Sequence, residues 1–421
     1  MRRTTRTTLA TSLLAVGALG LAACSGSGFD AETSSASTDT TPAASDSPLT
    51  MLIGSSGDAE TTAVMDTVAA WSDSSGTEAT VNVASDLNQE LSQGFAAGTP
   101  ADVFYLSTDA LPGYAANGSL YAYGDQMDNA DDFYPSLVKN FTYDGKLYCA
   151  PKDFSTLALV INTDAWAAAG LSDADIPTDW VSLEAAATKL TTADQVGLSF
   201  GPEYQRLGVF MAQAGGGLIS DDGTKAIIDS PENLEALTFV QKMLKDGVLK
   251  YPSDIDTGWG GEAFGSGKAA MTIEGNWIVG AMNNDYPTLK YSVVELTKGS
   301  AGQGTLQFTN CWGISADSKN QAAAVELVKY LTGTDQQLAF AKAFGVMPSI
   351  ASAGDGFRTQ FPAQSAFLDS ATFAVGMPTL QGSSDVITDF NGKIASLASG
   401  DPKAILAAEQ TNMQAAIDAK G

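Results

Sequence analysis

The sequence predicts an α/β fold divided into two lobes, and two observations lead to this prediction. Short apolar strands alternate with amphipathic helices along the chain, which is typical of parallel β-α-β units. The patterned region runs from residue 49 to residue 421. This is longer than the roughly 250–300 residues that one hydrophobic core usually organises, so we expect two cores.

Strand and helix signals follow one another from residue 49 onward. Met51–Gly54 predicts a strand, and the helix after it places Val64, Val68 and Trp71 on one face. Leu157–Ile161 is a continuous apolar run, as expected of a strand buried on both faces. The other predicted elements are strands at 79–83, 102–106, 146–150, 270–273 and 306–314, and helices at 87–95, 182–190, 203–213, 321–331, 335–344 and 404–419.

The best-marked helix boundaries lie between residues 230 and 247. Ser230 is a preferred N-cap residue, Pro231 suits the first helical position, and Glu232 places an acid in the first turn. Gly247 provides a stop at the other end. We therefore expect a helix that begins at Pro231 and ends just before Gly247.

The first 48 residues carry targeting signals. Arg2, Arg3 and Arg6 precede the apolar run Leu9–Leu21, which is too short to span a membrane, so residues 1–23 are predicted to be a secretory signal peptide. The following Cys24 resembles the lipobox cysteine of bacterial lipoproteins, which implies a lipidated N-terminus; the alternative is an ordinary signal peptide with an incidental cysteine. Residues 24–48 are rich in Ser, Gly, Thr and Ala and predict a flexible linker.

Composition narrows the possible ligands. The chain has 22 basic and 48 acidic residues, a net charge of −26, and loss of the signal peptide makes the mature chain still more acidic. This balance argues against nucleic acid and against anionic lipid beyond the anchor. Only Arg206 and Arg358 offer a guanidinium outside the signal peptide, which disfavours an anion receptor, although a helix N-terminus alone can bind an anion.

The absence of histidine excludes many enzyme classes. Neither a Ser-His-Asp triad nor an imidazole metal site is possible, and beyond Cys24 only Cys149 and Cys311 remain, too few for a thiolate cluster. Residues 265–270 match a dinucleotide-binding pattern but precede a strand, the reverse of the required order. We therefore expect no cofactor and no metal. A glycosidase with two carboxylates remains possible, and the two cysteines form either a disulfide or two free thiols.

Four groups of residues carry a resemblance to a known family. They are 95–103 (FAAGTPADV), 143–151 (YDGKLYCAP) with 159–164 (LVINTD), 263–277 (AFGSGKAAMTIEGNW), and 313–315 (GIS) with 318–323 (SKNQAA). In this order, behind a lipobox, the chain resembles the carbohydrate-type solute-binding lipoproteins of bacterial ABC importers, the maltose-binding-protein-like family. The resemblance covers nearly all of residues 49–421.

The resemblance implies a two-lobed periplasmic-binding-protein-like fold, with hinge strands and a ligand cleft between the lobes. Lobe 1 would comprise 49–150 and 312–350, lobe 2 would comprise 154–308 and 351–421, and the hinge strands would lie near 148–153 and 308–312. If the hinge strands are neighbours, as in the family, Cys149 and Cys311 are close enough to form a disulfide.

The resemblance also implies ligand-binding residues. Trp277 matches an aromatic residue that stacks on a sugar, Asp109 matches a carboxylate that accepts hydrogen bonds from hydroxyl groups, and Glu203 with Tyr204 matches a helix start that contacts sugar. The structural alternatives are a core tryptophan, a helix N-cap and a solvated acid, respectively.

Further candidates are Asp58, Asp153, Ser155, Trp259 and Asp385. A turn or cap role is the alternative for each of these acids. Trp259 lies in the Gly-rich loop 258–261, and we expect a large apolar side chain in such a loop to contact the ligand. The chain departs from the maltose-type pattern at three positions, Leu106, Ala110 and Ile387, so malto-oligosaccharide is one candidate ligand among several.

The expected function is capture of a neutral oligosaccharide between two lobes and its delivery to membrane permease subunits, without catalysis. The protein would be a monomer held by a lipid on the outer face of the cytoplasmic membrane. Two alternatives remain open: an extracellular carboxylate-pair glycosidase, and a receptor of the same fold for a polyamine or a peptide.

Overall fold

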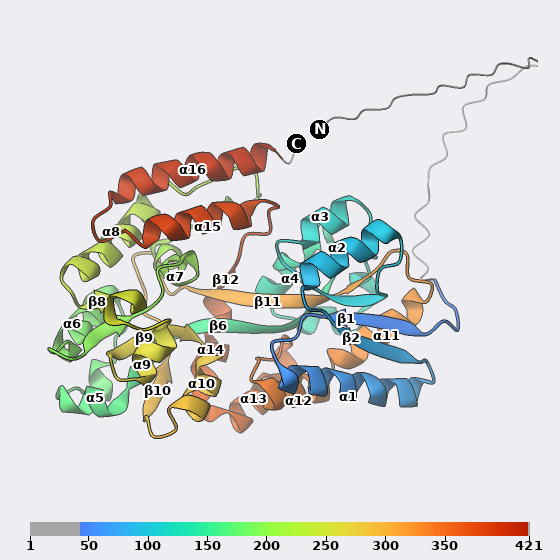
Figure 1. Cartoon of the computed structure of the whole chain (residues 1–421), viewed down its shortest axis with the longest axis horizontal. Helices are drawn as coiled ribbons and strands as arrows, with labels where there is room; N and C mark the ends of the chain where they lie inside the picture. The colour runs from blue at the N-terminus through green and yellow to red at the C-terminus, as the bar shows by residue number, and fades with distance from the viewer. Residues whose placement is uncertain (1–42, 420–421) are drawn as a thin grey trace, which may run out of the picture. The chain divides into compact units, whose positions relative to one another are not determined.

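The computed structural model describes residues 43–419, and within them most strands belong to one mixed sheet (Figure 1). The signal peptide, Cys24 and most of the predicted linker lie outside these residues. Along the sheet the strand order is β2-β1-β3-β11-β6-β9-β7-β8, with β10 beside β6 and β12 beside β11. The strands are β1 Leu49–Ile53, β2 Ala79–Val83, β3 Val103–Ser107, β6 Ala150–Asn162, β7 Val196–Ser199, β8 Leu249–Lys250, β9 Ala269–Gly275, β10 Tyr291–Val294, β11 Thr305–Ile314 and β12 Ala374–Gly376. A separate hairpin joins β4 Thr142–Tyr143 and β5 Lys146–Leu147.

The helices alternate with these strands, as the sequence predicts. Those before β9 are α1 Asp58–Ser75, α2 Leu87–Ala97, α3 Leu111–Ala116, α4 Pro135–Asn140, α5 Thr163–Ala168, α6 Trp180–Leu190, α7 Tyr204–Ala214, α8 Pro231–Lys245 and α9 Gly260–Gly265. Those after β9 are α10 Ile278–Asp285, α11 Gln321–Leu331, α12 Thr334–Phe344, α13 Gly354–Gln360, α14 Ser365–Asp369, α15 Ser383–Ile394 and α16 Pro402–Asp418.

The boundaries predicted for α8 are confirmed. The side chain of Ser230 accepts a hydrogen bond from the backbone N–H of Asn233, and Pro231 is the first helical residue. The helix ends at Lys245, and Gly247 follows with φ 73°, a left-handed conformation that glycine adopts without strain.

The expected parallel units occur in two groups. Strands β2, β1 and β3 are parallel to one another, and so are β9, β7 and β8. Strands β6 and β11 join the two groups, and each runs antiparallel to its neighbours along the main sheet. The sheet is therefore mixed, and two long strands, rather than a flexible linker, connect its halves (Figure 1).

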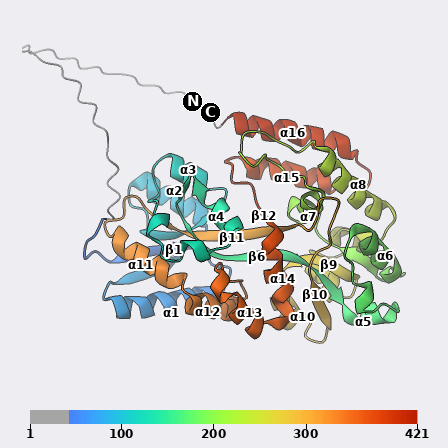
Figure 2. The ribbon, with the colours of Figure 1, turned by 180° about the vertical axis from the view of Figure 1, so that it is seen from behind.

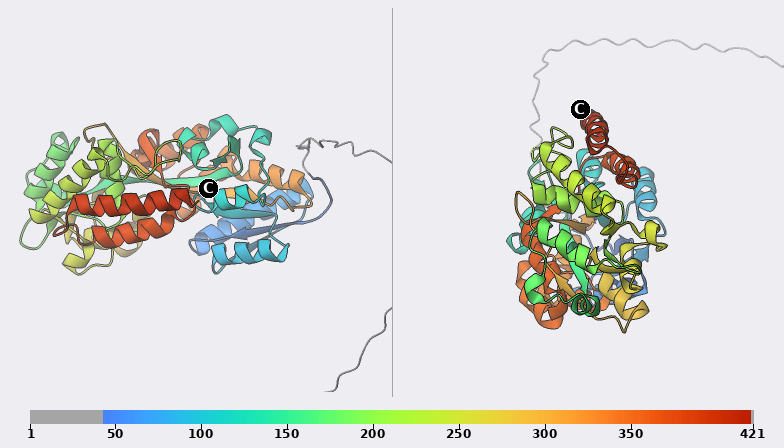
Figure 3. Two further views of the ribbon diagram at one scale, coloured as in Figure 1. Left: turned by 90° about the horizontal axis from the view of Figure 1, so that it is seen from above. Right: turned by 90° about the vertical axis from the view of Figure 1, so that its left-hand side faces the viewer.

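The apolar side chains form two main cores. The first contains Met51, Val68 and Trp312, and the second contains Leu159, Phe210 and Phe390. Helices α11 and α12 return late in the chain to pack on α1 (Figure 2), whereas α15 packs on α7 and α16 on α8. The last two helices, α15 and α16, drawn in red, lie side by side (Figure 3). A smaller cluster, which includes Phe154, combines side chains of β6, α9, α10 and α12.

Residues 43–47, predicted to be linker, contact helix α11. The backbone N–H of Ala43 donates to the side chain of Gln321 at 3.0 Å, and its carbonyl accepts from Ala322 N–H at 3.0 Å. The side-chain amide of Asn320 donates to the carbonyl of Ser47 at 3.0 Å. These contacts anchor the segment to the first core, so it is not free linker.

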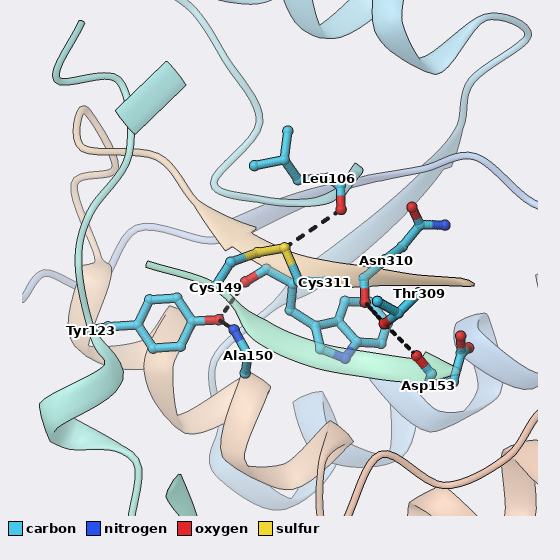
Figure 4. The surroundings of a disulfide bond; sticks show 9 residues. Leu106, Tyr123, Cys149, Ala150, Asp153, Thr309, Asn310 and Cys311 are labelled. Atoms are coloured by element: carbon cyan, nitrogen blue, oxygen red, sulfur yellow. Dashed lines mark hydrogen bonds between the residues drawn. A yellow bond between two sulfur atoms is a disulfide. The ribbon is translucent and has the colours of Figure 1, made fainter. Parts of the chain in front are cut away.

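The prediction of one continuous strand across residues 146–150 is wrong, because the chain bends within this range. Strand β5 ends at Leu147 and β6 begins at Ala150, and Cys149 lies in a bend between them. In this position Cys149 forms a disulfide with Cys311 of β11, with 5.5 Å between the two Cα atoms (Figure 4). Both cysteines are fully buried, and the bond ties the entry of β6 to β11.

Removal of this disulfide is expected to lower the free energy of unfolding. The bond joins residues 162 positions apart, so in the unfolded chain it closes a long loop, and its loss should cost about 2–4 kcal/mol. The measurement is denaturant unfolding of the Cys149→Ala/Cys311→Ala protein. A reductant should shift the unfolding midpoint of the unmodified protein toward that of the variant, and it should leave the midpoint of the variant unchanged. Equal midpoints for all samples would contradict the prediction.

Among residues 43–419, no helix combines the length and the apolar composition needed to cross a membrane.

Candidate functional site

The two joining strands are buried almost everywhere except at one point. In β6 only Ser155 is not buried, and in β11 only residues 308–310 are not buried. Phe308 is the register partner of Ser155, and Asn310 is the partner of Asp153. Paired residues of antiparallel strands share a face, as do residues two apart, so these four side chains lie on one face. We call Asp153, Ser155, Phe308 and Asn310 the crossing surface.

Both groups of parallel strands end beside the crossing surface. Strand β3 ends at Ser107, whose register partner on β11 is Asn310. Strand β9 ends at Gly275, whose partner on β6 is Leu157. Along β6 the two ends are four residues apart, from Asp153 to Leu157, or about 13 Å. In open α/β sheets, ligands bind beyond the carboxyl ends of the strands, and here two such edges adjoin one surface.

The edge of the first group carries two of the predicted acids. Asp109 follows β3, is partly buried, and accepts a hydrogen bond from Ser107 Oγ at 2.6 Å. The N-cap position of α3 belongs to Ala110, so Asp109 does not cap that helix. Asp58 is exposed in the first turn of α1, where a carboxylate also interacts favourably with the helix dipole.

The edge of the second group carries a connected polar cluster. Arg206 of α7 forms ion pairs with Glu203, at 2.8 Å, and with Glu274 of β9. The indole Nε1 of Trp277 donates to Glu274 Oε2 at 3.0 Å. We call Glu203, Arg206, Glu274 and Trp277 the Arg206 cluster.

Trp277 is exposed although it belongs to this cluster. Its side chain is 39% accessible, and its ring centroid lies 5.8 Å from that of Phe308 on the crossing surface. A Cβ atom at Gly275 would meet the indole at 2.2 Å, so the ring packs directly against the end of β9. The Trp277 ring therefore borders the crossing surface and presents apolar area to solvent.

Glu274, in contrast to Trp277, is buried. Its side chain is 1% exposed, and burial raises the pKa of this carboxyl, while Arg206 and the indole N–H of Trp277 act in the lowering direction. Glu203, by contrast, keeps 37% of its side chain exposed beside Arg206. Of the two carboxylates, only that of Glu203 is accessible to a solute.

A second charged cluster includes Asp153, the buried member of the crossing surface. The ammonium of Lys152 forms ion pairs with Glu60 of α1, at 2.8 Å, and with Asp153, and it lies 4.5 Å from the Tyr105 ring centroid. The Tyr105 hydroxyl donates to Glu60 at 3.0 Å, and Ser56 donates two further hydrogen bonds to this carboxylate. We call Glu60, Tyr105, Lys152 and Asp153 the Lys152 cluster; all four are at most 8% exposed.

The pKa values of the two acids in the Lys152 cluster move in opposite directions. Burial would raise the pKa of Glu60, but Lys152 and the hydrogen bonds from Ser56 outweigh it and hold this pKa below its ordinary value. For Asp153, burial outweighs the attraction of Lys152 and raises the pKa. Burial opposes the charge on Lys152, yet Asp153, Tyr105 and Glu60 together raise its pKa, so the ammonium stays charged.

This difference predicts a pH dependence of stability. The folded protein binds a proton at Glu60 less readily than the unfolded chain. Ionised Glu60 therefore contributes its full stability above about pH 4.5, and this contribution is lost as the pH falls through the folded-state pKa. Denaturant unfolding at a series of pH values should show the deficit of Glu60→Gln, relative to the unmodified protein, shrinking as the pH falls.

Asp153→Asn is the control, because its effect on stability should change with pH in the opposite direction. The raised pKa of Asp153 means that the folded protein takes up this proton more readily than the unfolded chain, so the unmodified protein should gain stability relative to Asp153→Asn on acidification. A deficit of Glu60→Gln that stays constant or grows at low pH would contradict the assignment.

The other sequence-predicted residues lie in several environments. Tyr204 is 3% exposed, with its ring 6.3 Å from Phe390 in the second core, so it supports the site from within. Trp259 is partly buried at the start of α9 and packs against the cluster around Phe154. Asp385 is exposed in the first turn of α15, as Asp58 is in the first turn of α1.

Sequence reasoning missed Phe308, Asn310 and Lys152 as site residues, and considered Arg206 only as an anion-binding group. Phe308 and Asn310 lie in a correctly predicted strand, but their exposure follows from the pairing of β11 with β6, which no local pattern reveals. Glu274 belongs to the family-like stretch 263–277 and lies three residues before Trp277. This proximity to a candidate site residue could have identified Glu274 as part of the site.

The site offers no free guanidinium. Arg206 is paired with Glu203 and Glu274, and Arg358 is paired with Asp355 and Asp369. Within the part of the chain that the structure describes, no group of three or more Cys, Asp or Glu side chains is arranged to hold a metal ion. Aromatic rings, carboxylates and amides are the groups that border the crossing surface.

Comparisons with known proteins place these features in context. The family model of bacterial extracellular solute-binding proteins matches residues 72–367, more than half of the chain. The diacetylchitobiose binding protein DasA of Streptomyces coelicolor is 27% identical over 273 residues, which are 62% of this chain and 64% of that protein. The galactooligosaccharide-binding protein of Bacillus subtilis is 25% identical over 341 residues, 77% of each chain.

The fold has a close structural counterpart. The crystal structure of the cyclic alpha-maltosyl-1,6-maltose binding protein from Arthrobacter globiformis superimposes with a TM-score of 0.78 at 20% identity. The match covers 88% of this chain and 99% of that protein. At this identity the likeness establishes the two-lobed fold.

Proposed function

This chain belongs to the family of bacterial extracellular solute-binding proteins, and from that premise we propose that it binds a neutral oligosaccharide for an ABC importer. The observation that carries the proposal is the exposed ring of Trp277 beside the crossing surface. An exposed indole matches the apolar C–H face of a sugar, and neighbouring carboxylates and amides match its hydroxyl groups.

The proposed contacts come from both strand groups. Trp277 and Phe308 supply aromatic surface, Glu203 and Asp109 supply carboxylates, and Ser155, on the only partly exposed position of β6, supplies a hydroxyl. Asp153 contributes mainly through Lys152, because its side chain is almost fully buried. Trp259, Asp58 and Asp385 stay secondary candidates.

The two main cores support a hinged mechanism. We assign lobe 1 to residues 49–150 and 312–350, lobe 2 to residues 154–308 and 351–421, and the hinge to the joining strands near 148–153 and 308–312. A ligand that contacts both strand groups favours the arrangement in which they approach each other. The loaded form would then deliver the solute to the permease subunits of the importer.

The proposal includes location and assembly. Members of the family act outside the cytoplasm, and the sequence around Cys24 is the basis for proposing a lipid anchor on the outer face of the membrane. We propose a monomer that leaves the solute chemically unchanged. Burial of Glu274 argues against a catalytic pair made of Glu274 and its neighbour Glu203, because both acids of a glycosidase must reach the scissile bond.

Isothermal titration calorimetry tests the proposal. The panel is diacetylchitobiose, galactooligosaccharides and maltotetraose, with spermidine and a short peptide as competing classes. We expect one neutral oligosaccharide to bind with a stoichiometry of one and to be recovered intact by chromatography after incubation. Binding of spermidine or the peptide alone would support the alternative receptor, and cleavage of a sugar would support a glycosidase.

A further inference from the structure

Arg206 is the central member of its cluster. One nitrogen of its guanidinium is bonded to Glu203 at 2.8 Å, the other to Glu274, and the guanidinium carbon lies 5.4 Å from the Trp277 ring centroid. Glu274 in turn accepts the indole N–H of Trp277. A single side chain thus contacts the exposed aromatic ring, the accessible carboxylate and the buried carboxylate behind them.

We propose that Arg206 is a positioning residue that fixes the orientations of the Trp277 ring and the Glu203 carboxylate before the solute arrives. The inference rests on the proposed function, since it assigns a role to these two groups in solute binding. Arg206 itself is not a contact for the solute: its side chain is 12% exposed, and both of its terminal nitrogens are engaged by carboxylates.

Burial and exposure are arranged as this role requires. Glu274 and Arg206 are almost covered, whereas Trp277 is 39% exposed and the Glu203 side chain is 37% exposed. The covered pair holds the two exposed groups from one side and leaves their other sides open. Without the pair, an exposed tryptophan would sample several rotamers, and binding would have to include the entropy cost of ordering it.

The chemistry requires arginine in particular. A guanidinium is planar and rigid, so it can bridge two carboxylates and stack against an aromatic face at the same time. An ammonium at this position would be a point charge without a stacking face. Both ion pairs of Arg206 lie within the cluster, so its terminal nitrogens are already bonded to carboxylates.

Fluorine NMR of protein labelled with 5-fluorotryptophan tests the positioning directly and without a ligand. The chain has six tryptophans, and loss of one resonance in Trp277→Phe assigns Trp277. In Arg206→Met we expect the Trp277 resonance to shift and broaden while that of Trp71, in the first core, is unchanged. Arg358→Met is the matched control, because Arg358 is also held by two carboxylates, those of Asp355 and Asp369, but belongs to α13.

Affinity is the second readout, measured with whichever of diacetylchitobiose, galactooligosaccharides and maltotetraose binds the unmodified protein. Arg206→Met should weaken binding by about tenfold or more, because the ring and the carboxylate are no longer pre-organised. The double variant Arg206→Met/Glu274→Gln removes both buried charges, so it should recover stability toward the unmodified protein while its affinity stays low.

Each outcome decides between the two roles. An unchanged Trp277 resonance in Arg206→Met overturns the inference, and so does an affinity restored in the double variant, which would mean that Arg206 only neutralises Glu274. If none of the three sugars binds the unmodified protein, the proposed function fails instead, and the NMR result still decides whether Arg206 orders Trp277.

Discussion

Lys152→Met is expected to lower the free energy of unfolding by about 3–5 kcal/mol, the cost of leaving buried charges without their partner. Lys152 is the shared cation of Glu60 and Asp153, and these two acids are 4% and 8% exposed. Methionine fills a similar volume, so lost packing contributes little to the effect. Urea unfolding, followed by circular dichroism, measures it.

Lys139→Met is the control for loss of a lysine. Lys139 forms an ion pair with Asp221 at 2.9 Å, but both side chains are largely exposed, and exposed pairs contribute little to stability. We expect its unfolding curve to match that of the unmodified protein. If Lys152→Met also unfolded at the unmodified midpoint, the Lys152 cluster would not have the structural role assigned to it.

Trp277→Ala is expected to weaken oligosaccharide binding by about 2 kcal/mol or more, as for a central aromatic contact of an interface. Some stability is also lost, because much of the ring is covered and buried Glu274 loses the indole N–H that it accepts. Calorimetry with the tightest-binding sugar gives the affinity, and thermal unfolding gives the stability. Affinity measured well below the unfolding temperature of the variant separates the two effects.

Two further variants sharpen this prediction. Trp277→Phe keeps an aromatic face but loses the indole N–H that Glu274 accepts. Its oligosaccharide affinity should therefore lie between those of the unmodified protein and Trp277→Ala. Val181→Ala removes a 79% exposed apolar side chain from α6, away from the crossing surface, and should leave affinity unchanged. Equal affinity for Trp277→Ala and Val181→Ala would remove Trp277 from the site.

Elements with local signals could be predicted from the sequence. The Ser230 cap with Pro231 marks the start of α8, and the run Leu157–Ile161 marks a strand buried on both faces. Both signals come from residues close in sequence, where side-chain pattern determines backbone conformation. The bend at Cys149 was missed because a disulfide to a strand 162 residues away determines it.

The site could be predicted only in part. The family-like stretch containing Trp277 identified the exposed ring, and the candidates Asp153 and Ser155 both lie on β6. The Lys152 cluster could not be foreseen, because α1 and β6 meet only in the folded chain and nothing near Glu60 indicates a buried partner. Tyr204 illustrates the reverse: its place at a helix start suggested solute contact, but the helix face points it into the second core.

A crystal structure of the protein with its tightest-binding oligosaccharide is the most direct test of the central claim. We predict an intact sugar between the two strand groups, with one ring stacked on Trp277 and hydroxyl groups hydrogen-bonded to Glu203 and to the crossing surface. An oligosaccharide bound elsewhere with the crossing surface vacant, or a cleaved sugar in the site, would contradict the account.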